Sequence, residues 1–142
     1  MNRYLLAIAA GAILTLPVQA GQYTEQVKAQ LIAIKMVGLS EGWEETHNDR
    51  FDSMGEGSSD SFSFTLRKGL SYKVFAVCDE DCSDLDLTLY DENQRVIAKD
   101  NSSDSMPVVG VTPSWSGRFS LGVRMYSCGS DICFYGISII GK

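Results

Sequence analysis

Residues 78–93, CDEDCSDLDLTLYDEN, gather acidic side chains at a spacing that suits a metal ion. Carboxylates are hard oxygen ligands, and Ca²⁺ takes about six to eight oxygens. Side chains two apart on a strand share a face, so Asp84 and Asp86 are expected to point the same way. The candidate calcium ligands are Asp79, Asp81, Asp84, Asp86 and Asp91. The alternative is a solvated acidic rim that protects a strand edge, because the glycine-bearing loop of an EF-hand is absent.

The four cysteines form two close pairs, Cys78 with Cys82 and Cys128 with Cys133. An even number of cysteines in an exported chain indicates disulfides. Four thiolates closing a zinc site is the competing interpretation, but the spacings are C-x3-C and C-x4-C. Pairing within each close pair is favoured among the three possible connectivities, although the sequence does not fix it.

Catalytic residues are scarce. His47 is the single histidine, and it lies in a polar stretch where we expect an exposed linker residue without a positioned nucleophile. The G-x-S-x-G and H-E-x-x-H motifs are absent. A glycosidase pair needs carboxylates facing each other about 5–10 Å apart, whereas Asp84 and Asp86 share one strand face. We therefore predict a protein that is not an enzyme, with a small hydrolase as the least favoured alternative.

Two aromatic residues are candidate ligand contacts. Trp115 lies in the turn PSWSG, and Tyr126 follows an alternating strand pattern. Exposed aromatic rings stack on sugars or anchor peptides. The alternative for Trp115 is that it covers one end of the core, since most large aromatic residues are at least partly buried.

Residues 1–20 have the features of a secretory signal peptide: Arg3, an apolar stretch over residues 5–16, and small residues before the expected cleavage site after Ala20. A retained anchor is the alternative, but the apolar stretch is short for a membrane span of about 20 residues. No later segment is apolar enough to span a bilayer. The protein is therefore expected in the periplasm or outside the cell.

The chain has 142 residues and a net charge of −6, which becomes −7 when Arg3 leaves with the signal peptide. Such a charge disfavours nucleic acid and anionic lipid as partners. The remaining length suits one domain with its own core.

Residues 21–59 are expected to form an amphipathic helix and a polar linker. Val27, Leu31 and Ile34 recur at helical spacing in residues 24–37, and Ile32 and Met36 widen the apolar face. Thr24 is the expected N-cap and Gly38 the left-handed C-terminal residue. Residues 39–60 lack periodicity and are expected to be a loop, with Trp43 and Phe51 as anchors on the domain.

From residue 60 to residue 142 the apolar period changes to two. Short alternating runs follow one another with turn residues between them: SDSFSFTL, SYKVFAVC, DLDLTLY, QRVIA, PVVGVT, RFSLGVRMY and CFYGISII. The connections are too short for crossover helices, so the sheets should be antiparallel. The sequence predicts an all-β protein, a jelly-roll-like β-sandwich of about seven to eight strands after one helix.

The strand residues resemble a known family. D-x-F-x-F-x-L-x-x-G at 60–69, Y-x-V-x-A at 72–76, D-L-D-L-x-L-Y-D at 84–91, P-x-V at 107–109 and S-G-x-F at 116–119 follow the order of the bacterial pre-peptidase C-terminal domain. The resemblance covers residues 60–140. It implies a secreted jelly-roll-like sandwich that usually trails a peptidase or another hydrolase, with some relatives binding collagen or polysaccharide. Here a helix and a linker precede it in place of a catalytic domain, and the cysteine pairs depart from the pattern.

Together these features predict a non-catalytic binding or accessory module that contacts a protein or a polysaccharide. A calcium-binding structural module is the alternative. No cofactor is expected apart from Ca²⁺.

Overall fold

The computed structural model describes residues 20–142. Residues 1–19, and with them almost all of the predicted signal peptide, lie outside that part. Helix α1 (Ala20–Ser40) is followed by the strands β1 (Glu44–Glu45), β2 (Arg50–Met54), β3 (Ser59–Leu66), β4 (Tyr72–Cys78), β5 (Cys82–Tyr90), β6 (Val96–Asp100), β7 (Val108–Val111), β8 (Gly117–Cys128) and β9 (Cys133–Gly141).

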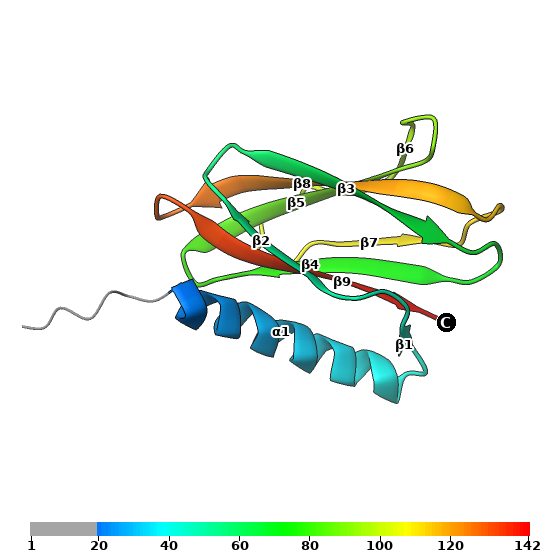
Figure 1. The fold of residues 1–142 in the computed structure, drawn as a ribbon, viewed down its shortest axis with the longest axis horizontal. Coiled ribbons are helices and arrows are strands. Elements are labelled where there is room, and N and C mark those ends of the chain that lie inside the picture. The colour runs from blue at the N-terminus through cyan, green and yellow to red at the C-terminus, as the bar shows by residue number, and fades with distance from the viewer. Residues whose placement is uncertain (1–19) are drawn as a thin grey trace, which may run out of the picture.

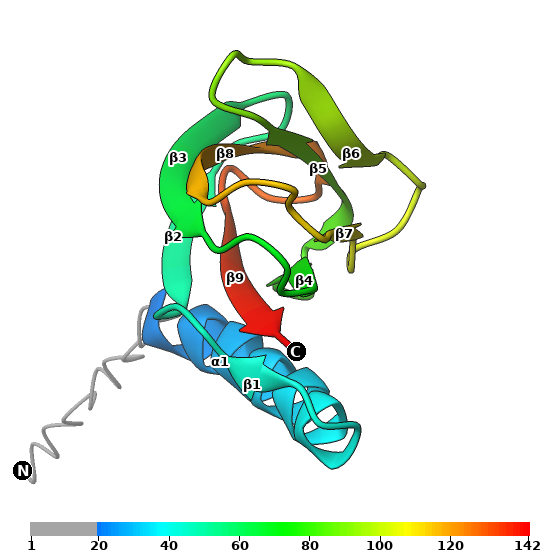
Figure 2. The same cartoon turned by 90° about the vertical axis from the view of Figure 1, so that its right-hand side faces the viewer.

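The strands form two antiparallel sheets. Sheet A has the order β1-β9-β4-β7, with β2 also paired to β9, and sheet B has the order β3-β8-β5-β6. The sheets face each other, and α1 lies against the outside of sheet A (Figures 1 and 2). The predicted all-β antiparallel sandwich with one preceding helix is confirmed. Nine strands form in residues 20–142, one more than the upper end of the prediction.

Alternation along the strands builds the core between the sheets. Leu85, Leu87 and Leu89 of β5 are fully buried. Their sheet neighbours on β8 and the inward residues of sheet A complete the same cluster: Phe119, Leu121, Val123, Met125, Val74, Ala76, Tyr135, Ile137 and Ile139. The intervening residues of β5 and β8 therefore face away from the core, on the outside of sheet B.

Helix α1 buries a second apolar cluster against the outer face of sheet A. Val27 and Leu31 are 1% and 0% exposed, and they pack with Phe75, Val77 and Ile140. The expected widening of this face was wrong, because Ile32 and Met36 are 55% and 65% exposed.

The ends of α1 also differ from the prediction. The helix runs from Ala20 to Ser40, so Thr24 and Gly38 lie inside it. Gly38 sits against the sheet, where an added Cβ would lie 3.2 Å from the side chain of Ile140. The left-handed residue after the helix is Gly42, with a φ of 86°.

The segment expected to be a loop forms two further strands. Glu44 and Glu45 pair with Gly141 and Ile140 of β9, and β2 pairs with residues 133–137 of the same strand. Strand β2 has the sequence RFDSM, and its residues 50–52 are exposed. It has no buried alternating positions, so no hydrophobic alternation in the sequence predicted it. The anchoring expected of Trp43 is present, since its side chain packs against the second cluster.

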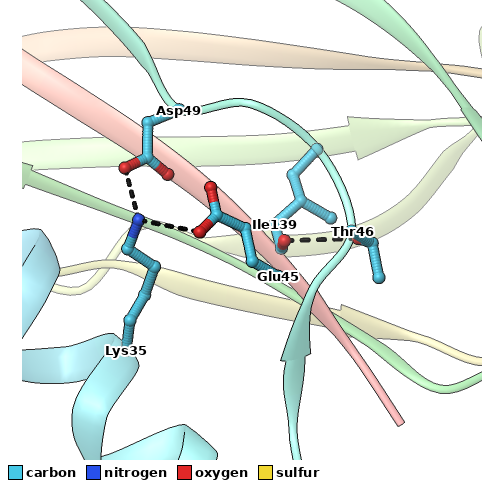
Figure 3. A network of polar contacts seen from close by, with 5 residues as sticks. All are labelled: Lys35, Glu45, Thr46, Asp49 and Ile139. Atoms are coloured by element: carbon cyan, nitrogen blue, oxygen red, sulfur yellow. Dashed lines mark hydrogen bonds and ion pairs between the residues drawn. The ribbon is translucent and has the colours of Figure 1, made fainter.

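A polar network fixes this segment to the helix (Figure 3). Lys35 Nζ of α1 lies 2.6 Å from Asp49 Oδ2 and 3.3 Å from Glu45 Oε2. Burial opposes the charge on Lys35, but the hydrogen bonds to the two carboxylates outweigh it and raise the lysine pKa. Thr46 Oγ1 also donates to the carbonyl of Ile139 at 3.2 Å. Residues 44–54 are therefore part of the sandwich.

Candidate functional site

Two of the predicted calcium ligands hold turns. Asp79 is 2% exposed, and its carboxylate accepts hydrogen bonds from the backbone N–H of Asp81 and of Phe134 at 3.1 and 2.7 Å. Asp91 accepts from the backbone of Asn93 and Arg95 at 2.8 and 2.9 Å. The backbone hydrogen bond from Arg95 is the main cause that lowers the pKa of Asp91. Both carboxylates therefore bind backbone N–H groups: Asp91 within its own turn, and Asp79 both in its turn and on β9.

The remaining candidates do not complete a metal cluster. Asp84 and Asp86 lie together on the outer face of sheet B, as their spacing predicted, whereas Asp81 belongs to the β4–β5 turn. Within residues 20–142, no group of three or more His, Cys, Asp or Glu side chains is placed to hold a metal ion. The five aspartates therefore do not converge on one point.

The cysteines form the two local disulfides. Cys78 bonds to Cys82 and Cys128 to Cys133, with Cα–Cα distances of 5.9 and 6.0 Å. None of the cysteines in the described chain is free, so the zinc interpretation has no thiolate available. Cys82 and Cys128 are also neighbours in the β5–β8 ladder, so both disulfides lie at one end of the sandwich.

His47 does not behave as the exposed linker residue that we expected. Its Nε2 donates to the carbonyl of Thr65 at 2.8 Å, and its Nδ1 lies 2.9 Å from Thr46 Oγ1. The ring makes edge contacts with Phe64 and Tyr72. Both ring nitrogens thus have partners within the fold, and these contacts hold His47 against β3 and β4.

A groove lies on the outer face of sheet B, and most of its lining side chains are polar. Its volume is about 360 Å³. Outward positions of β5 and β8, together with residues of β3, β6 and the loop after β6, line it: Ser59, Asp86, Thr88, Tyr90, Lys99, Asn101, Gly122, Val123, Arg124 and Tyr126. We call it the sheet B groove.

Asp86 lies in this groove directly across from Arg124 in the β5–β8 ladder. Its Oδ1 is buried without a hydrogen-bond partner, as is Oδ1 of the neighbouring Asp84. Burial raises the pKa of Asp86, the charge of Asp84 adds to the rise, and Arg124 and Lys99 oppose it. The groove therefore holds a partly buried carboxylate beside two cationic side chains.

Two tyrosines supply the aromatic surface. The Tyr90 ring lies over Gly122, where an added Cβ would be 3.3 Å from the ring. Glycine at this position therefore lets the ring lie close to the sheet. Tyr126 is 56% exposed, and the guanidinium of Arg124 lies 5.5 Å from its ring centroid. This contact orients the Tyr126 ring at the groove without burying it.

The two predicted aromatic contacts are in different places. Tyr126 lines the sheet B groove. Trp115 stacks on Phe119 at the start of β8, with ring centroids 5.5 Å apart, and is 38% exposed. Because Phe119 belongs to the main core, Trp115 packs over that end of the core, as in the alternative given for it above.

Several groove residues were missed from the sequence. Thr88, Lys99, Asn101, Gly122 and Arg124 carried no motif of their own. The alternation in DLDLTLY and RFSLGVRMY did place Asp86, Thr88 and Tyr90 on one face and Gly122, Arg124 and Tyr126 on another. The β5–β8 register brings these two sets of residues together, since it pairs Asp86 with Arg124 and Thr88 with Gly122. The sequence pattern does not determine this register.

The chain is similar to two solved structures. A periplasmic inhibitor of g-type lysozyme from Aeromonas hydrophila shares 8% identity at a TM-score of 0.49, covering 67% of this chain and 85% of that one. The pre-peptidase C-terminal domain of a collagenase from Bacillus anthracis shares 16% identity at a TM-score of 0.47, covering 65% and 87%. No protein-family model and no curated protein matches the chain. At these values neither likeness assigns a family or an activity.

The disulfides bear on where the protein resides. Disulfides are typical of oxidising compartments outside the cytoplasm, and the described cysteines are all paired. Among residues 20–142, no helix has the length and apolar content needed to cross a membrane.

Proposed function

We propose that this protein is an exported, non-catalytic binding module that holds a polysaccharide in the sheet B groove. The observation that carries the proposal is the combination of two tyrosine rings with a carboxylate and cationic donors in one groove. Tyr126 and Tyr90 supply the rings, and Asp86 supplies the acceptor.

A sugar chain matches this chemistry. The apolar face of a pyranose ring packs on an aromatic ring, and its hydroxyls both donate and accept hydrogen bonds. Asp86 accepts, Arg124 and Lys99 donate, and Asn101 and Thr88 do both.

The same groove does not favour hydrolysis. Asp84 and Asp86 are two apart on β5 and point to the same side of one strand. A glycosidase needs its two carboxyl groups on opposite sides of the scissile bond. Retention without cleavage is therefore the proposed activity.

Retention in affinity gels tests the proposal. Soluble xylan, mixed-linkage glucan and pectin are the probes, each cast separately in a native gel. We expect at least one to retard the protein, and Tyr126→Ala to weaken that retardation about tenfold, in line with the ~1–3 kcal/mol of a stacked aromatic contact. Its melting temperature should stay unchanged because Tyr126 is largely exposed.

Trp115→Ala is the matched control, and the opposite result is expected from it. It should lower the melting temperature, since it uncovers Phe119, while leaving the retardation intact. No retardation by any of the three polysaccharides, or equal retardation of wild type and Tyr126→Ala, would overturn the proposal.

Membership of the pre-peptidase C-terminal family is part of the same proposal. Its support is the order of the sequence motifs, which fall on β3, β4, β5, the segment that leads into β7, and the start of β8. Calcium binding stays a prediction. Asp84 and Asp86 are its remaining neighbouring ligands, and a rise in melting temperature with millimolar Ca²⁺ over EDTA would support it by linkage.

A further inference from the structure

The sheet B groove has aromatic rings at two levels along β8. The Tyr90 ring lies over Gly122, and Tyr126 follows Gly122 by four residues on the same strand. At the usual rise of a strand this separation is up to about 13 Å. One sugar ring stacks on one aromatic ring at a time. A ligand that uses both tyrosines is therefore a chain of several sugars.

A bulge in β8 sets the position of Tyr126. The β5–β8 register passes from Leu85 with Met125 to Asp84 with Ser127, so Tyr126 is an extra residue opposite β5. A bulge bends its strand and redirects the side chain that it carries, and bulges are frequent beside functional sites. The bulge and the guanidinium of Arg124 together place the Tyr126 ring at the groove.

Charges of both signs lie on the floor between these two levels. The β5–β8 register puts Asp86 level with Arg124, and the β5–β6 register puts Lys99 level with Thr88. All four side chains line the groove. A ligand that crosses this floor therefore meets a carboxylate, a hydroxyl and two cations within two neighbouring rows of the sheet.

The charges around Asp86 leave no excess of positive charge. Burial is the main cause that raises the pKa of Asp86, and the charges of Asp84 and Asp100 raise it further. Arg124 and Lys99 act in the opposite direction. Two cations thus face three carboxylates, and the chain as a whole carries a net charge of −6. Such a field does not attract a polymer of carboxylated sugars.

We propose that the sheet B groove selects an uncharged polysaccharide and binds an internal stretch of it, laid along β8 across both tyrosine rings. This inference rests on the proposed function and names the class of polysaccharide. The charged side chains act as hydrogen-bond partners of sugar hydroxyls, which both donate and accept. An acidic polysaccharide is excluded because it would add carboxylates to a site where they already outnumber the cations.

Affinity gels with polysaccharides of different charge test the choice of ligand. Mixed-linkage glucan is the uncharged probe, and polygalacturonate, which is fully de-esterified pectin, is the acidic one. The glucan should retard wild type equally at about 0.02 and 0.5 M salt, since salt screens ionic contacts and leaves stacking intact. Polygalacturonate should not retard wild type at either salt concentration.

A double variant tests whether the charge balance sets this choice. Asp84→Asn/Asp86→Asn leaves two cations against the single carboxylate of Asp100, so it should gain retardation by polygalacturonate that is lost at high salt. Glu44→Gln combined with Glu41→Gln is the matched control. These glutamates are exposed on β1 and just after α1, and the same change of net charge there should not admit polygalacturonate.

Competition by short sugars tests the internal stretch. Cellotetraose should release the protein from the glucan at least about tenfold more effectively than glucose, because it reaches the second ring. Equal competition by glucose overturns the inference, as does a double variant that behaves like its control.

The outcomes also separate this inference from the proposed function on which it rests. Retardation of wild type by polygalacturonate alone overturns the inference and leaves polysaccharide binding intact. A protein that no polysaccharide retards overturns the proposed function and the inference with it.

Discussion

The two outer faces of the sandwich have opposite chemistry. The outer face of sheet A presents Phe75, Val77 and Ile140, and α1 covers it. The outer face of sheet B presents Asp86, Arg124 and other polar side chains, and stays open. The covered face adds buried apolar area that stabilises the domain, and the open face is the one to which we assign the proposed binding.

The largest expected loss of stability comes from a substitution at the covered face of sheet A. Leu31→Ala should lower the free energy of unfolding by about 2–5 kcal/mol, since it empties a fully buried site between α1 and the sheet. Its neighbour Ile32, which points outward, should cost about 0.5 kcal/mol or less when changed to alanine. Urea unfolding of both variants at low protein concentration measures the difference. Equal losses would show that α1 does not pack as described.

Two glycine substitutions, one on each face, should have smaller effects on stability. An added Cβ at Gly136 would lie 2.6 Å from Val27 and 2.9 Å from Leu31, so Gly136→Ala should cost about 1–3 kcal/mol by pushing α1 from the sheet. At Gly122 the nearest atom is the Tyr90 ring at 3.3 Å, which faces the open groove. Gly122→Ala should therefore weaken polysaccharide retention more than stability. The reverse pattern in thermal unfolding and affinity gels would contradict this assignment.

The smallest expected effect is the pH dependence of two aspartates. Asp86 has a raised pKa, so its folded form binds a proton more tightly than the unfolded chain. Its contribution to stability rises as the pH falls through that raised pKa. Asp91 has a lowered pKa, and its contribution is present above the unfolded pKa and lost as the pH falls through the folded one.

Asparagine substitutions at the two positions test the opposite pH dependence of their contributions to stability. Asp86→Asn should stabilise at neutral pH, with the gain fading in acid. Asp91→Asn should destabilise at neutral pH, with the loss fading in acid. Urea midpoints from pH 7 to about pH 2.5, which spans the ordinary range of aspartate, measure both trends. Parallel trends in the two variants would refute the assignments.

Strands β5 and β8 were predictable because their inward residues alternate, as in Leu85, Leu87 and Leu89, whereas β4 and β9 were marked by continuous runs of strand-forming apolar residues. The buried side of α1 was predictable because Val27 and Leu31 are four residues apart, which is a helical spacing. Strands β1 and β2 were not, because their pairing partner β9 lies about ninety residues later in the sequence. The β1–β2 segment shows no alternation of its own.

The groove was only half visible in the sequence. Tyr126 and Asp86 were singled out, but for separate sites, since nothing local shows that β5 and β8 are neighbours with Asp86 beside Arg124. The aspartates of 78–91 looked like one cluster because they are close in sequence. The turns made by Asp79 and Asp91 send them to different ends of β5, where backbone N–H groups occupy them.

The position of β9 has a consequence for how the chain completes its fold. Strands β1 and β2 both pair with β9, and α1 packs over it. Because synthesis proceeds from the N-terminal end, α1 and both strands emerge long before residues 133–141 supply their partner. The helix must then wait with its apolar side unprotected, so folding includes a long-range closing step and an aggregation-prone interval before it.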